Sequence, residues 1–312
     1  MAELLTHDGT WTFDDKVIRI VPGRDRGVHK LRQTLGEVAV PLHAVAGIAY
    51  EPGRKGGRLR LRLRDGADPL LYATGGGLPD AADPYQVAVD PDRTGVAEYF
   101  ADEVRNALLL DQVPTGPTDS YLLPGPKVPL SASGGDGAAT FDGDRVAITW
   151  NWMAEEGKKS AGARELALGD LAGVEWRPNV GLENGHLRFR VKGAQATTQP
   201  PKHDPNSIVL WGLKKELGHT ALLAAAVAAR LPHPSDSGQT GQTGQTGRRP
   251  ELLAKPPVPA PEDAVPAQVT DHAEDPDALL RRLRELGDLK RDGILTDEEF
   301  TAAKSALLRR FG

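Results

Sequence analysis

The sequence predicts a mainly β protein with some helix, in which two diverged copies of one module precede a C-terminal αα-hairpin. Three observations predict this class. They are an internal repeat with a period of roughly 120 to 130 residues, short alternating strands between Gly, Pro and Asp turns, and leucine stripes at helical spacing near the C-terminus.

The repeat is identified from landmarks that recur in the same order in both copies. Written with the first copy before the second, they are Gly47 and Gly173, Tyr50 and Trp176, Pro52 and Pro178, Gly57 and Gly185, and Asp83-Pro84 and Asp204-Pro205. Upstream, the stretch 9–14 resembles 137–142, where each contains Gly-x-x-Thr-Phe-Asp. So many matches in one order indicate a duplication.

Each copy reads as a series of short strands closed by one helix. In the first copy we expect strands at residues 17–21, 37–42, 45–50 and 59–63, and a helix at 94–110. In the second copy we expect the closing helix at 217–231. Six or seven strands followed by a helix predict a β-barrel like that of pleckstrin-homology (PH) domains, closed by its C-terminal helix. The alternatives are a lipocalin-like arrangement and an open sandwich.

These patterns divide the chain into five segments. We assign residues 5–112 to the first PH-like repeat, 113–135 to a linker, 136–231 to the second repeat, 232–274 to a second linker and 275–312 to the hairpin. The second linker combines a Gly-Gln-Thr run with a Pro/Ala-rich stretch. Such a composition buries too little apolar surface to offset chain entropy, so it predicts disorder.

The hairpin is predicted from its caps and its apolar stripes. Asp275-Pro276 is typical of a helix start, and Thr296 with Glu299 forms a capping box for the next helix. A hairpin of this size without disulfide or metal needs a partner to be stable. We expect that partner to be the same segment of another chain, the repeats, or a different protein. The candidate partner-binding residues are Leu279, Leu280, Leu283, Leu286, Leu289, Phe300, Leu307 and Leu308.

Composition excludes several classes of function. The net charge of −5 argues against general nucleic-acid binding, which needs an excess of Lys and Arg. The absence of cysteine excludes disulfides and thiolate chemistry. The N-terminus has no signal-peptide pattern, and the most apolar stretch, 221–231, is about half the ~20 residues of a membrane span. We therefore expect a cytoplasmic protein.

A basic row offers candidate ligand-binding residues. Alternation in the first copy points its leucines to a core and its arginines outward, and the second copy repeats the pattern. The row could hold a phosphorylated group or an acidic peptide, together with the basic loops at 24–32 and 157–159. The alternative is a solvated strand face, or charged residues that keep a sheet edge from pairing with other chains. The candidates are Arg54, Lys55, Arg58, Arg60, Arg62, Arg64, Arg188 and Arg190.

Other motifs do not support catalysis or a cofactor. Asp288, Asp292, Gly293 and Glu299 match positions of a calcium loop, but Lys290 puts a cation where an oxygen ligand belongs. The tryptophans of the second copy are better explained by core packing than by a ligand cage. With no nucleophile motif in the chain, we expect no cofactor, no bound metal and no enzymatic activity.

Two resemblances add to this interpretation. The leucine helix, Asp292-Gly293-Ile294-Leu295-Thr296 and the following helix resemble the SHOCT (short C-terminal) domain, which implies an interaction or oligomerisation tail. The two repeats resemble a tandem actinobacterial domain of unknown function in the bacterial PH-like group. That resemblance implies a fold and a domain order but no catalytic residues.

Together these features predict a non-enzymatic binding or scaffold protein. Two PH-like modules would recognise a ligand, and the hairpin would provide self-association or docking to another protein. The alternative is a peripheral sensor of an anionic lipid or phosphorylated ligand, acting through its basic strand faces.

Overall fold

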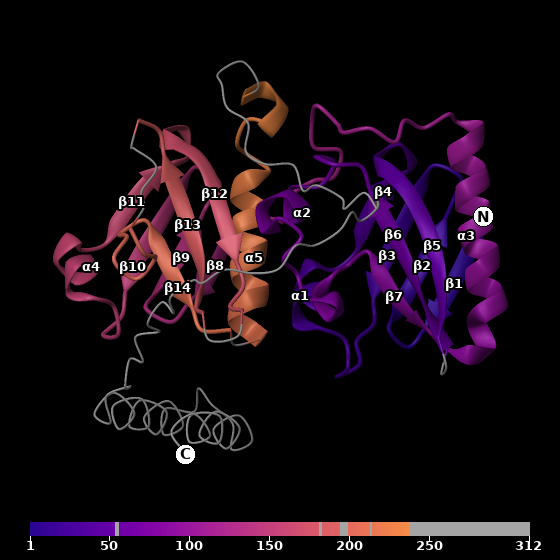
Figure 1. Cartoon of the computed structure of the whole chain (residues 1–312), viewed down its shortest axis with the longest axis horizontal. Helices are drawn as coiled ribbons and strands as arrows, with labels where there is room; N and C mark the ends of the chain where they lie inside the picture. The colour runs from indigo at the N-terminus through magenta and orange to yellow at the C-terminus, as the bar shows by residue number, and fades with distance from the viewer. Residues whose placement is uncertain (54–55, 181–182, 194–198, 213, 238–312) are drawn as a thin grey trace, which may run out of the picture. The chain divides into compact units, whose positions relative to one another are not determined.

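The computed structural model describes residues 1–53, 56–180, 183–193, 199–212 and 214–237. These residues form two modules of similar build, each made of antiparallel sheets and a few helices (Figure 1), so the predicted mainly β class is confirmed. The predicted hairpin and most of the second linker lie outside the described residues.

The first module combines two sheets with a closing helix. One sheet has the order β1-β2-β3-β4, with strands β1 (Ala2–Thr6), β2 (Gly9–Phe13), β3 (Val17–Pro22) and β4 (Val38–Pro41). The other has the order β5-β6-β7, with strands β5 (Val45–Gly53), β6 (Gly56–Leu63) and β7 (Gln86–Val89). Its helices are α1 (Lys30–Leu35), α2 (Pro69–Thr74) and α3 (Thr94–Leu110), with 3-10 turns η1 (Leu42–Ala44), η2 (Asp80–Ala82) and η3 (Pro91–Arg93). Helix α3 occupies the residues predicted for it.

The second module repeats this plan. One sheet has the order β11-β10-β9-β8, with strands β8 (Leu130–Ser133), β9 (Gly137–Phe141), β10 (Arg145–Trp150) and β11 (Arg164–Ala167). The other has the order β12-β13-β14, with strands β12 (Leu171–Arg177), β13 (Gly185–Val191) and β14 (Ser207–Leu210). Its helices are α4 (Glu156–Ala161) and α5 (Lys214–Ala228), with 3-10 turns η4 (Leu168–Asp170) and η5 (Pro234–Ser237).

A closed barrel, the first fold predicted for each module, is wrong. Each module has two separate sheets that share one core, which is closer to the open-sandwich alternative. In both modules a 3-10 turn lies between the two sheets, η1 in the first and η4 in the second. At this turn the chain leaves the first sheet and enters the second. The closing helix packs on the core instead, as α3 does against β1, β5 and β6.

The start of each module lies upstream of the predicted start. Strand β1 begins at Ala2, and β8 lies inside the residues that the sequence assigned to a linker. Strand β8 reads Leu-Ser-Ala-Ser, a short stretch of mostly small residues with weak intrinsic strand preference. Its pairing with β9 makes it a strand, and that contact is tertiary.

The matched landmarks of the repeat have matched physical roles. A Cβ on Gly9 would lie 2.6 Å from the carbonyl oxygen of Val21, and one on Gly137 would lie 2.5 Å from that of Thr149. Both positions therefore need glycine because a neighbouring strand approaches so closely.

In both modules an aromatic side chain of the long strand contacts the closing helix through a hydrogen bond. The Tyr50 hydroxyl lies 3.0 Å from the Thr94 hydroxyl, and the Trp176 indole N–H donates to the Thr220 hydroxyl at 2.9 Å. Each pair joins the aromatic residue of the long strand to the helix. The two contacts meet the helices at different points, because Thr94 is the first residue of α3 and Thr220 lies in the middle of α5. The strands just before the helices, β7 and β14, are offset by 121 residues, as are Asp83 and Asp204.

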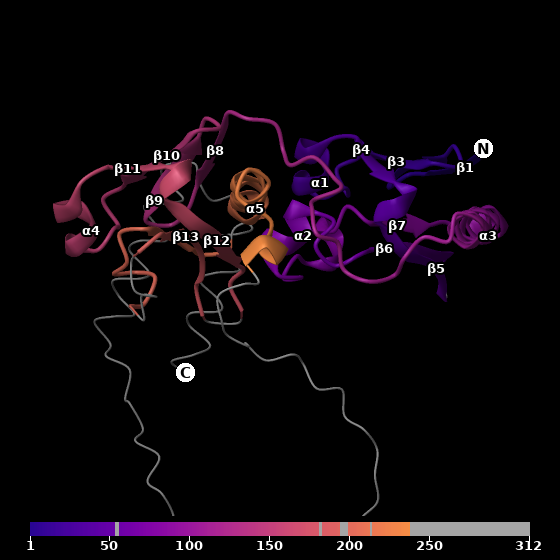
Figure 2. The same cartoon turned by 90° about the horizontal axis from the view of Figure 1, so that it is seen from above.

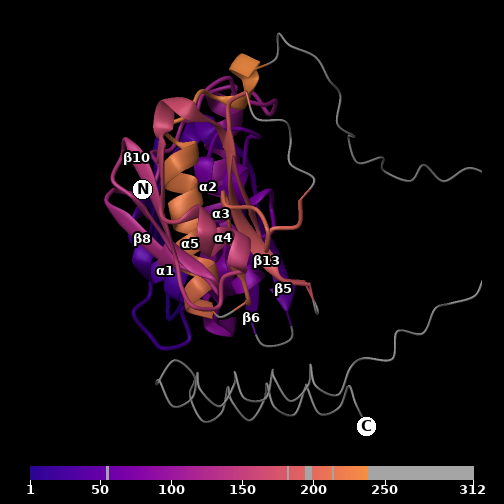
Figure 3. The same cartoon turned by 90° about the vertical axis from the view of Figure 1, so that its left-hand side faces the viewer.

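The two modules are joined through α5. From Ala221 to Ala228 the helix is buried on every side, because it packs on its own sheets and also against α1 and α2 of the first module. Figures 2 and 3 show α5 lying beside α1 and α2. One apolar cluster therefore includes Leu31 and Leu70 of the first module together with the core of the second.

Candidate functional site: a groove at the module junction

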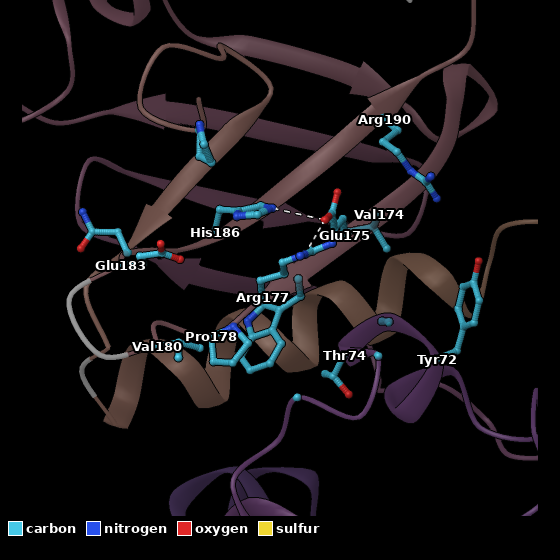
Figure 4. A pocket seen from close by; sticks show the side chains of 16 residues that line it. Tyr72, Thr74, Val174, Glu175, Arg177, Pro178, Val180, Glu183, His186 and Arg190 are labelled. Carbon is cyan, nitrogen blue, oxygen red and sulfur yellow. Dashed lines mark hydrogen bonds and ion pairs between the residues drawn. The ribbon is translucent and has the colours of Figure 1, made fainter. Parts of the chain in front are cut away.

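The candidate site is a groove of about 910 Å³ where the two modules meet. One wall is the end of α2 and the loop after it, and the other is β12 with the strand beside it (Figure 4). The lining residues are Tyr72, Ala73, Thr74, Gly75, Gly77, Val174, Glu175, Trp176, Arg177, Pro178, Val180, Glu183, Asn184, His186, Arg190 and Pro201. Both repeats must therefore be folded and joined for this groove to exist.

Consecutive residues of β12 line the groove. Side chains of a strand alternate between its two faces, yet every residue from Val174 to Pro178 contributes. Such a continuous run means that the groove follows the edge of the strand. The strand order β12-β13-β14 agrees, because it leaves β12 with a neighbour on one side only within the described residues.

A polar group of three side chains lies on the outward face of this sheet. The Arg177 Nε lies 2.7 Å from the Glu175 Oε1, and the His186 Nε2 lies 3.6 Å from the same oxygen (Figure 4). Burial raises the pKa of the Glu175 carboxyl, but His186 and the arginines outweigh it and lower that pKa overall. Burial lowers the pKa of His186 even though Glu175 opposes the shift. Near neutral pH the group is an ionised Glu175 held by Arg177, beside a neutral imidazole.

Arg190 is placed at the other end of this surface by a glycine. It lies opposite Gly173 in the β12–β13 register, at a bulge. A Cβ on Gly173 would come within 2.5 Å of the Arg190 guanidinium, so glycine leaves the space in which that group lies. Arg190 is exposed and, among the described residues, forms no ion pair. Figure 4 shows Arg190 and Tyr72 at the same end of the groove, one from each wall.

The predicted basic row of the first module is largely engaged within the protein. Arg58 and Arg60 both reach the Asp80 carboxylate, at 2.7 and 3.3 Å. Arg64 donates to backbone carbonyl oxygens, among them that of Gly116 in the inter-repeat segment. Arg62 is exposed and, within the described part of the chain, has no ion pair.

The second-module candidates differ from each other. Arg188 forms an ion pair with the buried Asp204, with Nε and Oδ2 2.9 Å apart, whereas Arg190 lines the groove. The structure thus brings one of the eight candidate ligand-binding residues to the groove. Arg54 and Lys55 lie outside the described residues, and so do the candidate partner-binding residues Leu279, Leu280, Leu283, Leu286, Leu289, Phe300, Leu307 and Leu308.

The two basic loops expected to add to an anion site each place one cation in the interior of its module. Residues 30–35 and 156–161 fold as α1 and α4, and each helix directs a cation inward. Arg32 is 4% exposed and binds both carboxylate oxygens of Asp8 at 2.9 Å. Lys158 is fully buried, with its Nζ 2.5 Å from Asp136 Oδ2. These two cations are therefore not available to a ligand.

Each of these ion pairs also secures the last strand of its module. The Asp8 carboxylate accepts from the amide of Ala88 at 3.0 Å, and Asp136 accepts from that of Val209 at 2.8 Å. The turn before the second strand, the short helix and the last strand are thus tied together in both copies. The sequence carried a signal for this: Asp8 and Asp136 both precede the matched glycine of Gly-x-x-Thr-Phe-Asp.

No group of three or more metal-ligating side chains occurs among the described residues. No helix in the described part of the chain is long and apolar enough to cross a membrane.

Comparison with known proteins places the chain in a family. Residues 11–105 and 139–228 each match the domain of unknown function DUF4429, and together these matches span more than half of the chain. The protein therefore belongs to the DUF4429 family and carries its domain in two tandem copies. A search of curated proteins finds no match.

Proposed function

We propose that the chain is a non-enzymatic binding protein, in which two PH-like modules form one recognition body and a C-terminal SHOCT-like hairpin recruits partners. The observation that carries the proposal is the groove at the module junction, which is lined by side chains of both repeats. Four strands, three strands and a closing helix in each module support the PH-like assignment. We expect this protein to act in the cytoplasm.

The burial of α5 supports a fixed arrangement of the two modules. Ala221, Ala224, Ala225 and Ala228 are at most 1% exposed, and their surroundings include α1 and α2 of the first module. Separating the modules would expose this alanine surface to water, which is unfavourable in proportion to its apolar area. A binding site shared by both modules therefore keeps its shape.

The tail supplies the assembly part of the proposal. The leucine stripes predicted at residues 279–311 need an apolar partner, and the predicted flexible linker allows them to reach one on another chain. Clustering several recognition bodies would raise the avidity for a multivalent target without any new contact in the groove.

The test is the solution mass of two chains by light scattering. One is the full chain, and the other stops at Ser237. A chain that stops at Leu231 would lose two contacts with the rest of the protein, because His233 Nε2 lies 3.0 Å from the Gly66 carbonyl oxygen and Ser235 Oγ donates to the Asp119 carbonyl oxygen. We expect the full chain to be oligomeric and the shorter chain monomeric. Two monomeric chains would refute self-association, and pull-down with residues 275–312 would then test docking to another protein.

A second candidate function is a peripheral sensor of anionic lipid. It is favoured by the exposed Arg62, which forms no ion pair among the described residues. It predicts salt-sensitive binding to phosphatidylserine vesicles that is lost when Arg58, Arg60 and Arg62 become Glu. Binding that survives this change would refute it.

A further inference from the structure

Within the described residues, no strand pairs with the edge of β12 that faces away from β13, and the groove runs along this edge from Val174 to Arg177. An edge strand presents unpaired N–H and C=O groups, and proteins use such edges to bind extended peptides by main-chain hydrogen bonds. At about 3.3 Å per residue, four strand residues match a peptide segment of about 13 Å.

The corresponding edge in the first module is protected. There the Nε of Arg105, from α3, donates to the carbonyl oxygen of Ile48 on β5 at 3.2 Å. With the offset of 121 residues that relates β7 to β14, the position in α5 that corresponds to Arg105 is Ala226. An alanine side chain has no hydrogen-bond donor. The two diverged copies thus differ at this edge, and the groove lies along the one without this side-chain hydrogen bond.

Charge gives the groove a direction. Arg190 lies beside the start of β12, opposite Gly173, while Glu183 lies beyond its end (Figure 4). Between them, Arg177 neutralises Glu175 at 2.7 Å. The groove is therefore positive at the start of β12 and negative past its end.

The sheet fixes how a peptide would lie in this field. Every strand pair of this sheet is antiparallel, and an added strand that continues this pattern would run from Arg177 toward Gly173. Its N-terminal part would lie near Glu183, and its C-terminal part would lie near Arg190. A negative charge at the C-terminal side of the peptide would then meet the Arg190 guanidinium, with the Tyr72 hydroxyl on the facing wall.

We propose that the groove binds an extended peptide of another protein, paired antiparallel with β12, whose C-terminal carboxylate or acidic side chain is held by Arg190. This inference rests on the proposed function and names the class of its ligand. Val174 and Trp176, which line the groove from the inner face of β12, belong to the apolar core of the second module.

The experiment uses the full chain and a phage library that displays random peptides with free carboxyl termini. We expect enrichment of sequences with an acidic residue or the terminal carboxylate at one fixed position. Synthetic copies of the enriched peptides then serve as probes for titration. Arg190→Glu should weaken their binding at least about tenfold, because it replaces a charge-assisted hydrogen bond with repulsion. A peptide with Lys at the acidic position should recover binding to this variant.

Arg62→Glu is the matched control, because Arg62 lies opposite Gly47 in the first module as Arg190 lies opposite Gly173. It should change peptide affinity less than about twofold. Equal losses in both variants would refute a site at Arg190, and so would the absence of any enriched peptide.

Hydrogen exchange of the full chain tests the placement on the strand. Alternate amides of β12 should exchange quickly in the free protein and slowly with peptide bound. Slow exchange before any peptide is added would refute an external ligand and indicate that the chain's own tail occupies the edge. Binding of phosphatidylserine vesicles but no peptide would also refute the proposal. None of these outcomes depends on the mass from light scattering, so this inference can fail while the proposed assembly stands.

Discussion

Replacing Lys158 with Met tests how the second module is held together. The side chain is fully buried, and its Nζ lies 2.5 Å from Asp136 Oδ2 and 2.6 Å from the Ser207 carbonyl oxygen. It also lies 4.8 Å from the centre of the Trp150 ring. Methionine is similar in length and creates little cavity, so the change removes the charge while largely keeping the packing.

The expected loss follows from the group that is left behind. After Lys158→Met, the Asp136 carboxylate stays buried with the Val209 amide as its remaining donor. Removing one partner of a buried ion pair costs about 3–5 kcal/mol, because the other charge is then uncompensated. We expect the free energy of unfolding to fall by this amount. Adding Asp136→Asn should recover part of it, since no unpaired carboxylate then remains.

Urea unfolding followed by circular dichroism measures the effect, and Lys159→Met is the control. Lys159 is exposed and lies 3.7 Å from the exposed Glu156, so its loss should cost less than about 0.5 kcal/mol. If Lys158→Met and Lys159→Met differ by less than about 1 kcal/mol, the buried pair does not stabilise the module and the reasoning is wrong.

Two further predictions concern the groove and the junction. Because burial lowers the pKa of His186 below its ordinary 6.5, the unfolded chain takes up this proton first as the pH falls. The stability contributed by the neutral imidazole is therefore complete above pH 6.5 and is lost as the pH falls through the lowered pKa. Urea midpoints measured from about pH 7.5 to about pH 5 should decline less steeply in His186→Gln than in the parent. Equal slopes in the two proteins would contradict this. Ala224→Glu places a charge on the fully buried part of α5 and should cost on the order of 3–5 kcal/mol, seen as a lower urea midpoint and as new proteolytic cleavage between the modules. The control is Glu98→Ala on the exposed side of α3, which should be nearly neutral. A resistant Ala224→Glu variant would show that α5 does not hold the modules together.

This comparison of Ala224 with Glu98 shows why the junction does not recur at α3. The outer face of α3 carries Glu98, Tyr99 and Asp102 in solvent, whereas the buried part of α5, which packs against the first module, is rich in alanine. Charged residues on the outer face end a stack of repeats by making further apolar packing unfavourable. The two copies therefore form one closed pair in which the roles of the two helices differ.

The sequence alone determined the repeat and much of the local structure. The alternation of leucine and arginine placed Leu59, Leu61 and Leu63 in the core, because a strand turns successive side chains to opposite faces. The limits of α3 followed from its helical spacing of apolar residues. The matched glycines followed from the duplication, since close backbone approach leaves no room for a side chain in either copy.

Tertiary structure decided the rest. Arg32 and Lys158 look like surface cations in a basic loop, and their burial depends on carboxylates more than 20 residues away in sequence. The alanines of α5 fit any apolar helix, and their packing on the first module depends on how two separate cores meet. The groove has no local motif because its walls come from Tyr72 to Gly77 and from Val174 to Arg190, which only the joined modules bring together. Local patterns report the geometry of one element, whereas a site between elements is set by packing between parts of the chain that are distant in sequence.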